Sequence, residues 1–178
     1  MNFIENQLQN FLIPNLYSNV LVITEDEKKV DISNDSSKED SKPQEIAFNF
    51  LGDNKKEIVL IVNEPNAVFL TDECYNFLSN LLAACKLNMA DVAIININKQ
   101  PLTFDAIKTK MKVSFAILFD VNTGEINLPF TIPQYQIQPY NNCKFLVSTS
   151  LYNLSQPTQE AKLEKSKLWV CLKNLFQL

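Results

Sequence analysis

The stretch from residue 57 to residue 98 constrains the fold of this chain more than any other part of the sequence. It opens with Ile58 to Val62, an unbroken apolar run with β-branched side chains, which is typical of a strand buried on both faces. Thr71 or Asp72 can accept hydrogen bonds from the free amides at the start of a helix. A second apolar run then spans Val92 to Ile97. Strand, helix and strand in this order predict a right-handed βαβ crossover, and therefore a parallel α/β sheet.

Apolar residues recur at helical spacing after Asp72, so we expect one face of this helix to lie in the core. The expected core positions are Tyr75, Leu78, Leu81, Leu82 and Cys85. A second helix is predicted over 102–112, through Phe104, Ile107 and Met111. A third is predicted over 158–176, after Pro157, with core positions Ala161, Leu168, Cys171, Leu172 and Leu175.

Two further apolar runs, Val113 to Phe119 and Cys143 to Val147, are the predicted third and fourth strands. The fold class is therefore α/β: a single domain with a central four-stranded, mainly parallel sheet flanked by helices. With 178 residues and 46% hydrophobic residues, the chain can bury one sizeable core but not two.

Three segments around these elements are harder to assign. Apolar and other residues alternate from Ile46 to Leu51. This pattern predicts an edge strand that pairs, across the turn at Gly52-Asp53-Asn54, with the central strand Ile58 to Val62. The segment 126–140 contains Pro129, Pro133 and Pro139, which favours an extended surface path over a regular element. Residues 148–156 read as a loop.

The N-terminal part divides into an apolar arm, 1–23, and a polar linker or loop, 24–43, before the α/β domain, 44–178. In the arm, a short amphipathic helix is predicted before Pro14. Its apolar residues are Phe3, Ile4, Leu8, Phe11 and Leu12. The linker is charged and serine-rich, so burial cannot repay its ordering entropy. The arm either packs on its own domain or serves as a recognition arm for another protein.

Composition excludes several classes of function. The net charge is -4, all 16 cationic residues are lysine, and the chain has no histidine. A guanine-reading arginine fork and a histidine base, nucleophile partner or metal ligand are therefore impossible. We expect no strong direct binding of nucleic acid, because that requires clustered cations.

The four cysteines lie inside apolar periodic stretches and show no C-x-x-C spacing; they are Cys74, Cys85, Cys143 and Cys171. We interpret them as free core cysteines, with zinc binding as the alternative. We expect no metal and no cofactor. Glu5 and Asn6 stand where a signal peptide would be apolar, and no apolar stretch is long enough to span a membrane, so the expected location is cytoplasmic.

Two motifs resemble the uracil-DNA glycosylase fold. The first is IVNEPN, residues 61–66, followed by FL and by the helix and strand that end in NINKQP. The second is LVSTSLYNL, residues 146–154, which stands where active glycosylases have a His-Pro-Ser loop, followed by a helix containing Leu168-Trp169. The resemblance covers roughly residues 57–175 and implies a site formed by two loops, with Asn63, Glu64, Pro65, Asn66, Asp72, Ser148 and Ser150.

The chain departs from active glycosylases where their chemistry requires particular residues. The family uses a glycine in the first loop, for close approach of a flipped base, and a histidine in the second loop, for charge stabilisation. This chain has Asn66 and Ser148 at those places. Glu64 and Asp72 are the remaining candidates to activate water. Without an oxyanion donor of known geometry they are weak support for a hydrolase, and we expect no catalytic residues.

The non-catalytic psi-subunit family of bacterial DNA polymerase III has a similar organisation. Its short N-terminal segment resembles ENQLQNFLIPNLY, residues 5–17, and its second loop and Leu-Trp helix resemble STSLYNL and Leu168-Trp169. The resemblance implies a bridge in DNA replication, in which the arm binds a clamp-loader subunit and the domain binds a chi-like subunit on the side of the single-stranded-DNA-binding protein. The alternative is a degenerate glycosylase-fold domain that binds another protein or a small nucleobase-like ligand.

Overall fold

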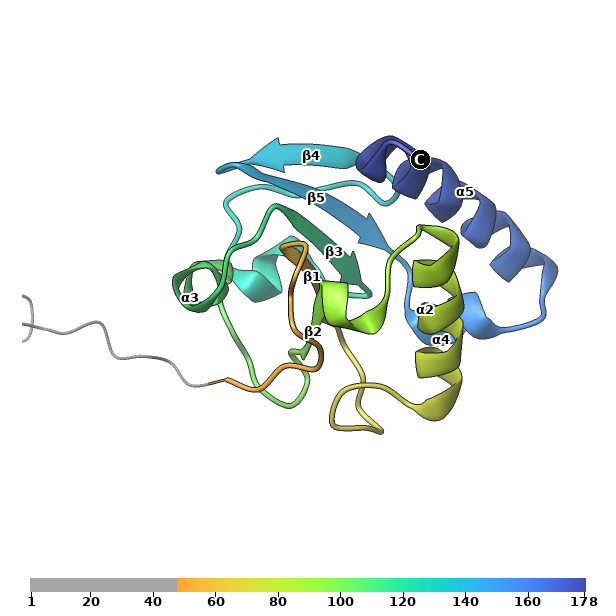
Figure 1. The fold of residues 1–178 in the computed structure, drawn as a ribbon, viewed down its shortest axis with the longest axis horizontal. Coiled ribbons are helices and arrows are strands. Elements are labelled where there is room, and N and C mark those ends of the chain that lie inside the picture. Colours follow the sequence, from red (N-terminus) through yellow and green to blue (C-terminus); the bar gives the residue numbers. More distant parts are fainter. Residues whose placement is uncertain (1–47) are drawn as a thin grey trace, which may run out of the picture. The chain divides into compact units, whose positions relative to one another are not determined.

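The buried apolar runs of the sequence form the middle of a five-stranded sheet in a computed structural model, which describes residues 48–178 (Figure 1). The strands lie in the order β2-β1-β3-β5-β4. Their bounds are Ile58–Val62 for β1, Val92–Asn96 for β2, Phe115–Phe119 for β3, Ile137–Tyr140 for β4 and Cys143–Ser148 for β5. The strands β2, β1, β3 and β5 pair in parallel, and β4 pairs antiparallel with β5. The prediction of a mainly parallel α/β sheet is confirmed.

Alternate residues of the central strands enter two separate cores. In β1, Ile58, Leu60 and Val62 pack on one face of the sheet, whereas Val59 and Ile61 pack on the other. All five are almost fully buried. A strand covered on both faces needs no polar residues, which is why the sequence shows an apolar run instead of alternation.

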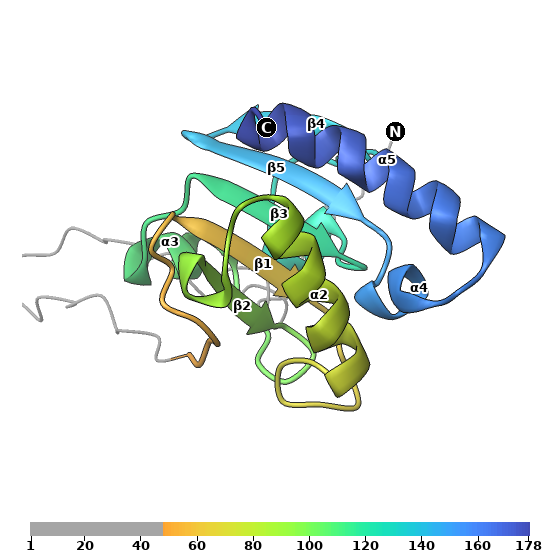
Figure 2. The ribbon, with the colours of Figure 1, turned by 45° about the vertical axis from the view of Figure 1, so that its right-hand side comes forward.

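Helices cover both faces of the sheet (Figure 2). The helices α2 (Asp72–Ala84), α4 (Leu151–Ser155) and α5 (Gln159–Phe176) contribute to the core on one face. The helix α3 (Phe104–Lys110) and the 3-10 helix Thr123–Ile126 contribute to the core on the other. A second 3-10 turn, Met89–Asp91, leads into β2.

The C-terminal helix matches its sequence pattern closely. Thr158 caps it by accepting a hydrogen bond from the Ala161 amide at 3.1 Å. The buried residues of α5 are the predicted Ala161, Leu168, Cys171, Leu172 and Leu175. For α2 the prediction is wrong at one position, because Tyr75 is 41% exposed and the neighbouring Cys74 is fully buried. The buried stripe of α2 thus runs through Cys74, Leu78 and Leu82.

The fifth strand corrects the sequence analysis. Residues 126–140 were expected to follow an irregular surface path, yet Ile137–Tyr140 forms β4 and pairs antiparallel with β5. Pro139 is tolerated because β4 lies at the sheet edge, where a missing amide hydrogen costs no internal hydrogen bond. The sheet therefore has five strands instead of four.

Two other segments also differ from expectation. Leu51 pairs with Ile94 of β2 in a single antiparallel bridge, so the segment does not form an edge strand paired with β1. Residues 151–155 form α4 instead of a loop, since Ser150 caps a short helix by accepting from the Asn153 amide at 3.1 Å.

The predicted arm and linker, with Phe3, Ile4, Leu8, Phe11 and Leu12, lie outside the described residues. Within residues 48–178, none of the helices has both the length and the apolar character needed to cross a bilayer.

Candidate functional site

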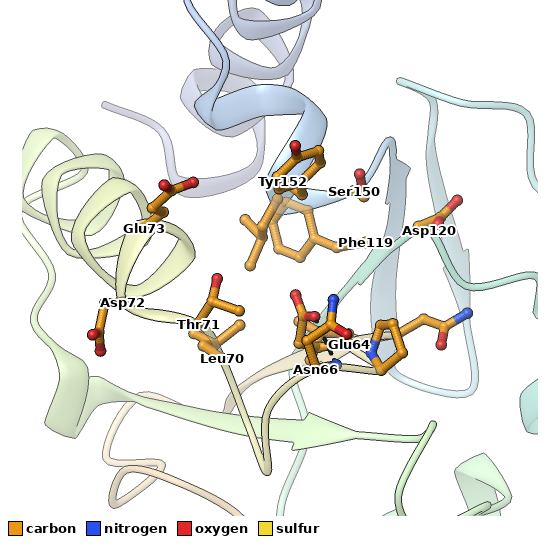
Figure 3. Close-up of a pocket in the computed structure, with 14 residues that line it drawn as sticks. Glu64, Asn66, Leu70, Thr71, Asp72, Glu73, Phe119, Asp120, Ser150 and Tyr152 are labelled. Carbon is orange, nitrogen blue, oxygen red and sulfur yellow. Dashed lines mark hydrogen bonds between the residues drawn. The ribbon is translucent and has the colours of Figure 1, made fainter.

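The loop after β1 and the segment after β5 meet at the carboxyl edge of the sheet and enclose a cavity of about 590 Å³ (Figure 3). Its volume is in the range of small-molecule sites. The lining residues are Val62, Asn63, Glu64, Pro65, Asn66, Leu70, Thr71, Asp72, Glu73, Phe119, Asp120, Ser150, Leu151 and Tyr152. Carboxyl ends of neighbouring parallel strands commonly form such crevices. The two loops that the resemblance singled out thus lie together.

Asn96, at the end of β2, holds the first loop in place. Its carboxamide donates to the carbonyls of Glu64 at 2.7 Å, Ala67 at 3.1 Å and Val68 at 3.2 Å. Its oxygen accepts from the amides of Glu64 at 3.0 Å and Asn98 at 3.1 Å. Because Asn96 is fully buried, these bonds replace water for a loop that has no regular structure. Sequence analysis missed Asn96, although an asparagine at the end of an apolar strand is the kind of signal that marks such a role.

Glu64 is the most enclosed charged residue of the site, with 9% of its surface exposed. Its Oε1 accepts from the Asn66 amide at 3.1 Å. Its Oε2 lies 4.0 Å from the Cys74 thiol, which is a weak donor. Among residues 48–178, no lysine forms an ion pair with it. The carboxylate therefore stands in the cavity wall with little of its hydrogen-bonding capacity used.

Asp72, the second candidate for activating water, does not cooperate with Glu64. It is exposed on the first turn of α2 and points away from Glu64 in Figure 3. Thr71 is the N-cap of that helix, with its hydroxyl 3.4 Å from the Cys74 amide. The pair shares no hydrogen bond among the described contacts, so the geometry contains no paired general acid and base.

The two serines of the second loop have different surroundings. Ser150 lines the cavity and caps α4. Ser148 is fully buried at the end of β5, does not line the cavity, and has no hydrogen-bond partner for its Oγ within the described part of the chain. Thr149 donates its amide to the Tyr135 hydroxyl at 3.5 Å. Burial raises the pKa of Tyr135, which keeps its phenol protonated.

Several residues of the site were not predicted from the sequence, among them Phe119 and Asp120, at the end of β3, and Tyr152 on α4. Phe119 is buried against the wall, and Tyr152 is 55% exposed. The position of Asp120 directly after a buried strand was an available signal, because such residues gather at the carboxyl edge. Tyr152 was hidden by the assignment of its segment to a loop.

The described residues contain no cluster of histidine, cysteine or carboxylate side chains arranged to hold a metal ion. The four cysteines are free and buried. Burial raises the pKa of Cys85 to about 11 and of Cys143 to about 12, so these thiols are not nucleophiles at neutral pH. Their places in the core agree with the interpretation as small apolar residues.

Comparison with known proteins supplies no family. No protein-family model matches the sequence, and a search of curated proteins finds no significant match.

Proposed function

We propose that this protein is a non-catalytic accessory protein of DNA replication, a psi-like bridge between a clamp-loader subunit and a chi-like subunit. The observation that carries the proposal is the order of the motifs along the chain. An apolar N-terminal stripe precedes a polar stretch, then the loop IVNEPN, then STSLYNL and the helix with Leu168-Trp169. Each motif is short, and the combination is what resembles the psi-subunit family.

The departures from active glycosylases favour a binding role. The chain has no histidine to stabilise a developing charge, Asn66 replaces the loop glycine, and Ser148 is buried behind the cavity wall. Glycosidic bond cleavage needs a preorganised charge-stabilising group. We expect no excision of uracil or hypoxanthine from single- or double-stranded DNA. Measurable turnover that disappears in Glu64→Gln would refute the non-catalytic assignment.

The outer face of α5 is a candidate surface for the chi-like partner. Leu163 and Val170 are 64% and 53% exposed, and they lie seven residues apart, on the same side of the helix. Lys167 lies between them. An interaction there would remove both apolar side chains from water, which is favourable.

The test is co-purification from native extract with identification by mass spectrometry. The full chain should retain clamp-loader and chi-like subunits. Phe11→Asp should lose the clamp loader, because a charge cannot be buried in an apolar contact, whereas Phe11→Leu should keep it. Leu163→Asp combined with Val170→Asp should lose only the chi-like subunit. Retention of neither replication protein by the unmodified chain contradicts the proposal.

A second candidate function is binding of a small ligand. The cavity between the loops of residues 63–72 and 148–156 favours it, because a ligand-binding glycosylase-like domain requires a site at that place. Titration of the full chain with free nucleobases distinguishes a nucleobase-like ligand from other chemistry.

A further inference from the structure

The lining of the cavity at the carboxyl edge is negatively charged. Four carboxylates line it, from Glu64, Asp72, Glu73 and Asp120, and no lysine does. The chain has neither arginine nor histidine. Charge in a concave site is focused by the low-dielectric walls, so the cavity attracts cations and repels phosphate groups.

Part of this charge has a structural explanation. Asp72 and Glu73 occupy the first turn of α2, where carboxylates interact favourably with the helix dipole. Glu64 is different, because it lies in the loop after β1 and belongs to no helix. Asp120 likewise follows β3 in a loop. The helix dipole therefore does not account for these two carboxylates.

Glu64 is more than nine-tenths buried and receives one backbone hydrogen bond and one weak thiol contact. A buried carboxylate is costly unless an opposite charge or several donors satisfy it. Figure 3 shows its oxygens beside the Asn66 carboxamide, on the side of the cavity that faces Phe119 and Tyr152. The open acceptor positions of Glu64 are thus available to a donor within the cavity.

The rest of the wall suits an apolar stem and a flat cationic group. Leu70 supplies apolar surface, the ring of Phe119 lies buried, and Tyr152 supplies an exposed ring at the opposite side. Aromatic faces attract ammonium and guanidinium groups. A volume of about 590 Å³ accommodates such a group together with several carbon atoms.

We propose that this cavity binds an ammonium or guanidinium group on an apolar stem, held by Glu64 beside the exposed ring of Tyr152. The group belongs either to a small free amine or to a basic side chain of a protein. The inference develops the ligand-binding candidate and does not depend on the bridging function, so loss of one leaves the other in place.

The experiment is calorimetric titration of the full chain with butylguanidinium and with butylurea, which has a similar shape and no charge. We expect a dissociation constant of about 1 mM for butylguanidinium, the range for a ligand of this size. Butylurea should bind at least about tenfold more weakly, because it lacks the charge that Glu64 recognises. A second pair, acetyl-arginine methylamide and acetyl-citrulline methylamide, shows by comparison with butylguanidinium whether a peptide side chain or a small free cation binds more tightly.

Glu64→Gln keeps an oxygen for the Asn66 amide and should weaken butylguanidinium binding by about tenfold or more. Asp120 is exposed in the same wall, so Asp120→Asn should weaken butylguanidinium binding less than Glu64→Gln does. It provides the test of charge recognition if Glu64→Gln does not fold. Asp53→Asn is the matched control, since Asp53 is exposed, lies outside the cavity and pairs with Lys55. Equal binding of the charged and neutral compounds overturns the proposal, as does undiminished binding in Glu64→Gln and Asp120→Asn.

Discussion

The two edges of the sheet carry opposite charges. The cavity at the carboxyl edge has four carboxylates and no lysine in its lining, whereas a groove of about 500 Å³ at the amino edge has three lysines and no carboxylate side chain. The three are Lys56, Lys86 and Lys144. In a parallel α/β fold, helices begin at the carboxyl edge and end at the amino edge, so their dipoles are aligned.

The turns of the helices follow this rule. Carboxylates lie in the first turn of each long helix: Asp72 and Glu73 in α2, Asp105 in α3 and Glu160 in α5. Lysines occupy the last turns of α3 and α5, and Lys86 follows the end of α2. Two of the four cavity carboxylates and one of the three groove lysines therefore lie at helix ends, where they compensate the helix dipole and indicate no ligand by themselves. Glu64 and Asp120 belong to no helix, and of these two only Glu64 is buried.

The edges also differ in how they are held together. At the amino edge, main chain packs against main chain: a Cβ on Gly52 would lie 2.2 Å from the Val92 carbonyl oxygen and 2.6 Å from that of Met89. At the carboxyl edge, the buried side chain of Asn96 makes most of the side-chain hydrogen bonds to the loop, and Asn98 and Lys99 add one each from the surface. The first arrangement tolerates almost no substitution, and the second depends mainly on one buried carboxamide.

The largest effect is expected at Gly52. Its φ of +101° and its close approach to backbone oxygens leave no room for a methyl group. Gly52→Ala should lower the free energy of unfolding by about 4 kcal/mol. Gly124→Ala is the matched control, because a Cβ there meets nothing within 4 Å, and it should be nearly neutral. Urea denaturation measures both, and similar losses in the two variants would show that close main-chain packing does not hold the amino edge.

A smaller loss is expected at Asn96. Asn96→Ala removes the carboxamide and leaves buried carbonyl and amide groups of the first loop unpaired, which should cost about 3 kcal/mol. Asn98→Ala is the control, since Asn98 is exposed and bonds to the Asn63 side chain at 2.9 Å. It should cost under about 1 kcal/mol. If both asparagines prove equally dispensable in urea denaturation, the carboxyl-edge loop is held by other contacts.

The smallest effect tests the dipole explanation. Asp72→Lys places a cation at the N-terminus of α2 and should lower the free energy of unfolding by about 1 kcal/mol. Asn80→Lys, at an exposed position in the middle of the same helix, should change it by less than about 0.5 kcal/mol. The difference should shrink in about 1 M salt. A salt-independent difference would mean that Asp72 acts through packing instead of charge.

The sequence predicted the elements whose pattern depends on burial alone. The apolar runs of β1, β2, β3 and β5 appear as strands, and the spacing in α5 identified its five buried residues. Pairing could not be predicted in the same way. Because β4 lies at the edge, its sequence carries only weak signals of burial, and Pro139 argued against a strand. The bridge from Leu51 to β2 depends on how the chain crosses the sheet, which no local pattern encodes.

Of the predicted site residues, those of the first loop line the cavity, whereas much of the remaining lining was not predicted. Glu64 and Asn66 were identified because they follow a buried strand in a recognisable motif. Ser148 was expected in the site, but it is the last residue of β5, is fully buried and does not line the cavity. Phe119 and Tyr152 join the cavity only through the strand order, which brings the end of β3 between β1 and β5.

The most direct test of the bridging function is association of the purified chain with the purified clamp loader, measured for the full chain and for residues 44–178. We predict that the full chain binds and that the shorter chain does not, while its melting temperature stays nearly unchanged. Burial of large apolar side chains of the arm on a partner supplies the affinity, at about 1.5–3 kcal/mol each before ordering costs. Equal binding by both chains would contradict the account, and unfolding of the shorter chain would place the arm in the core of its own domain.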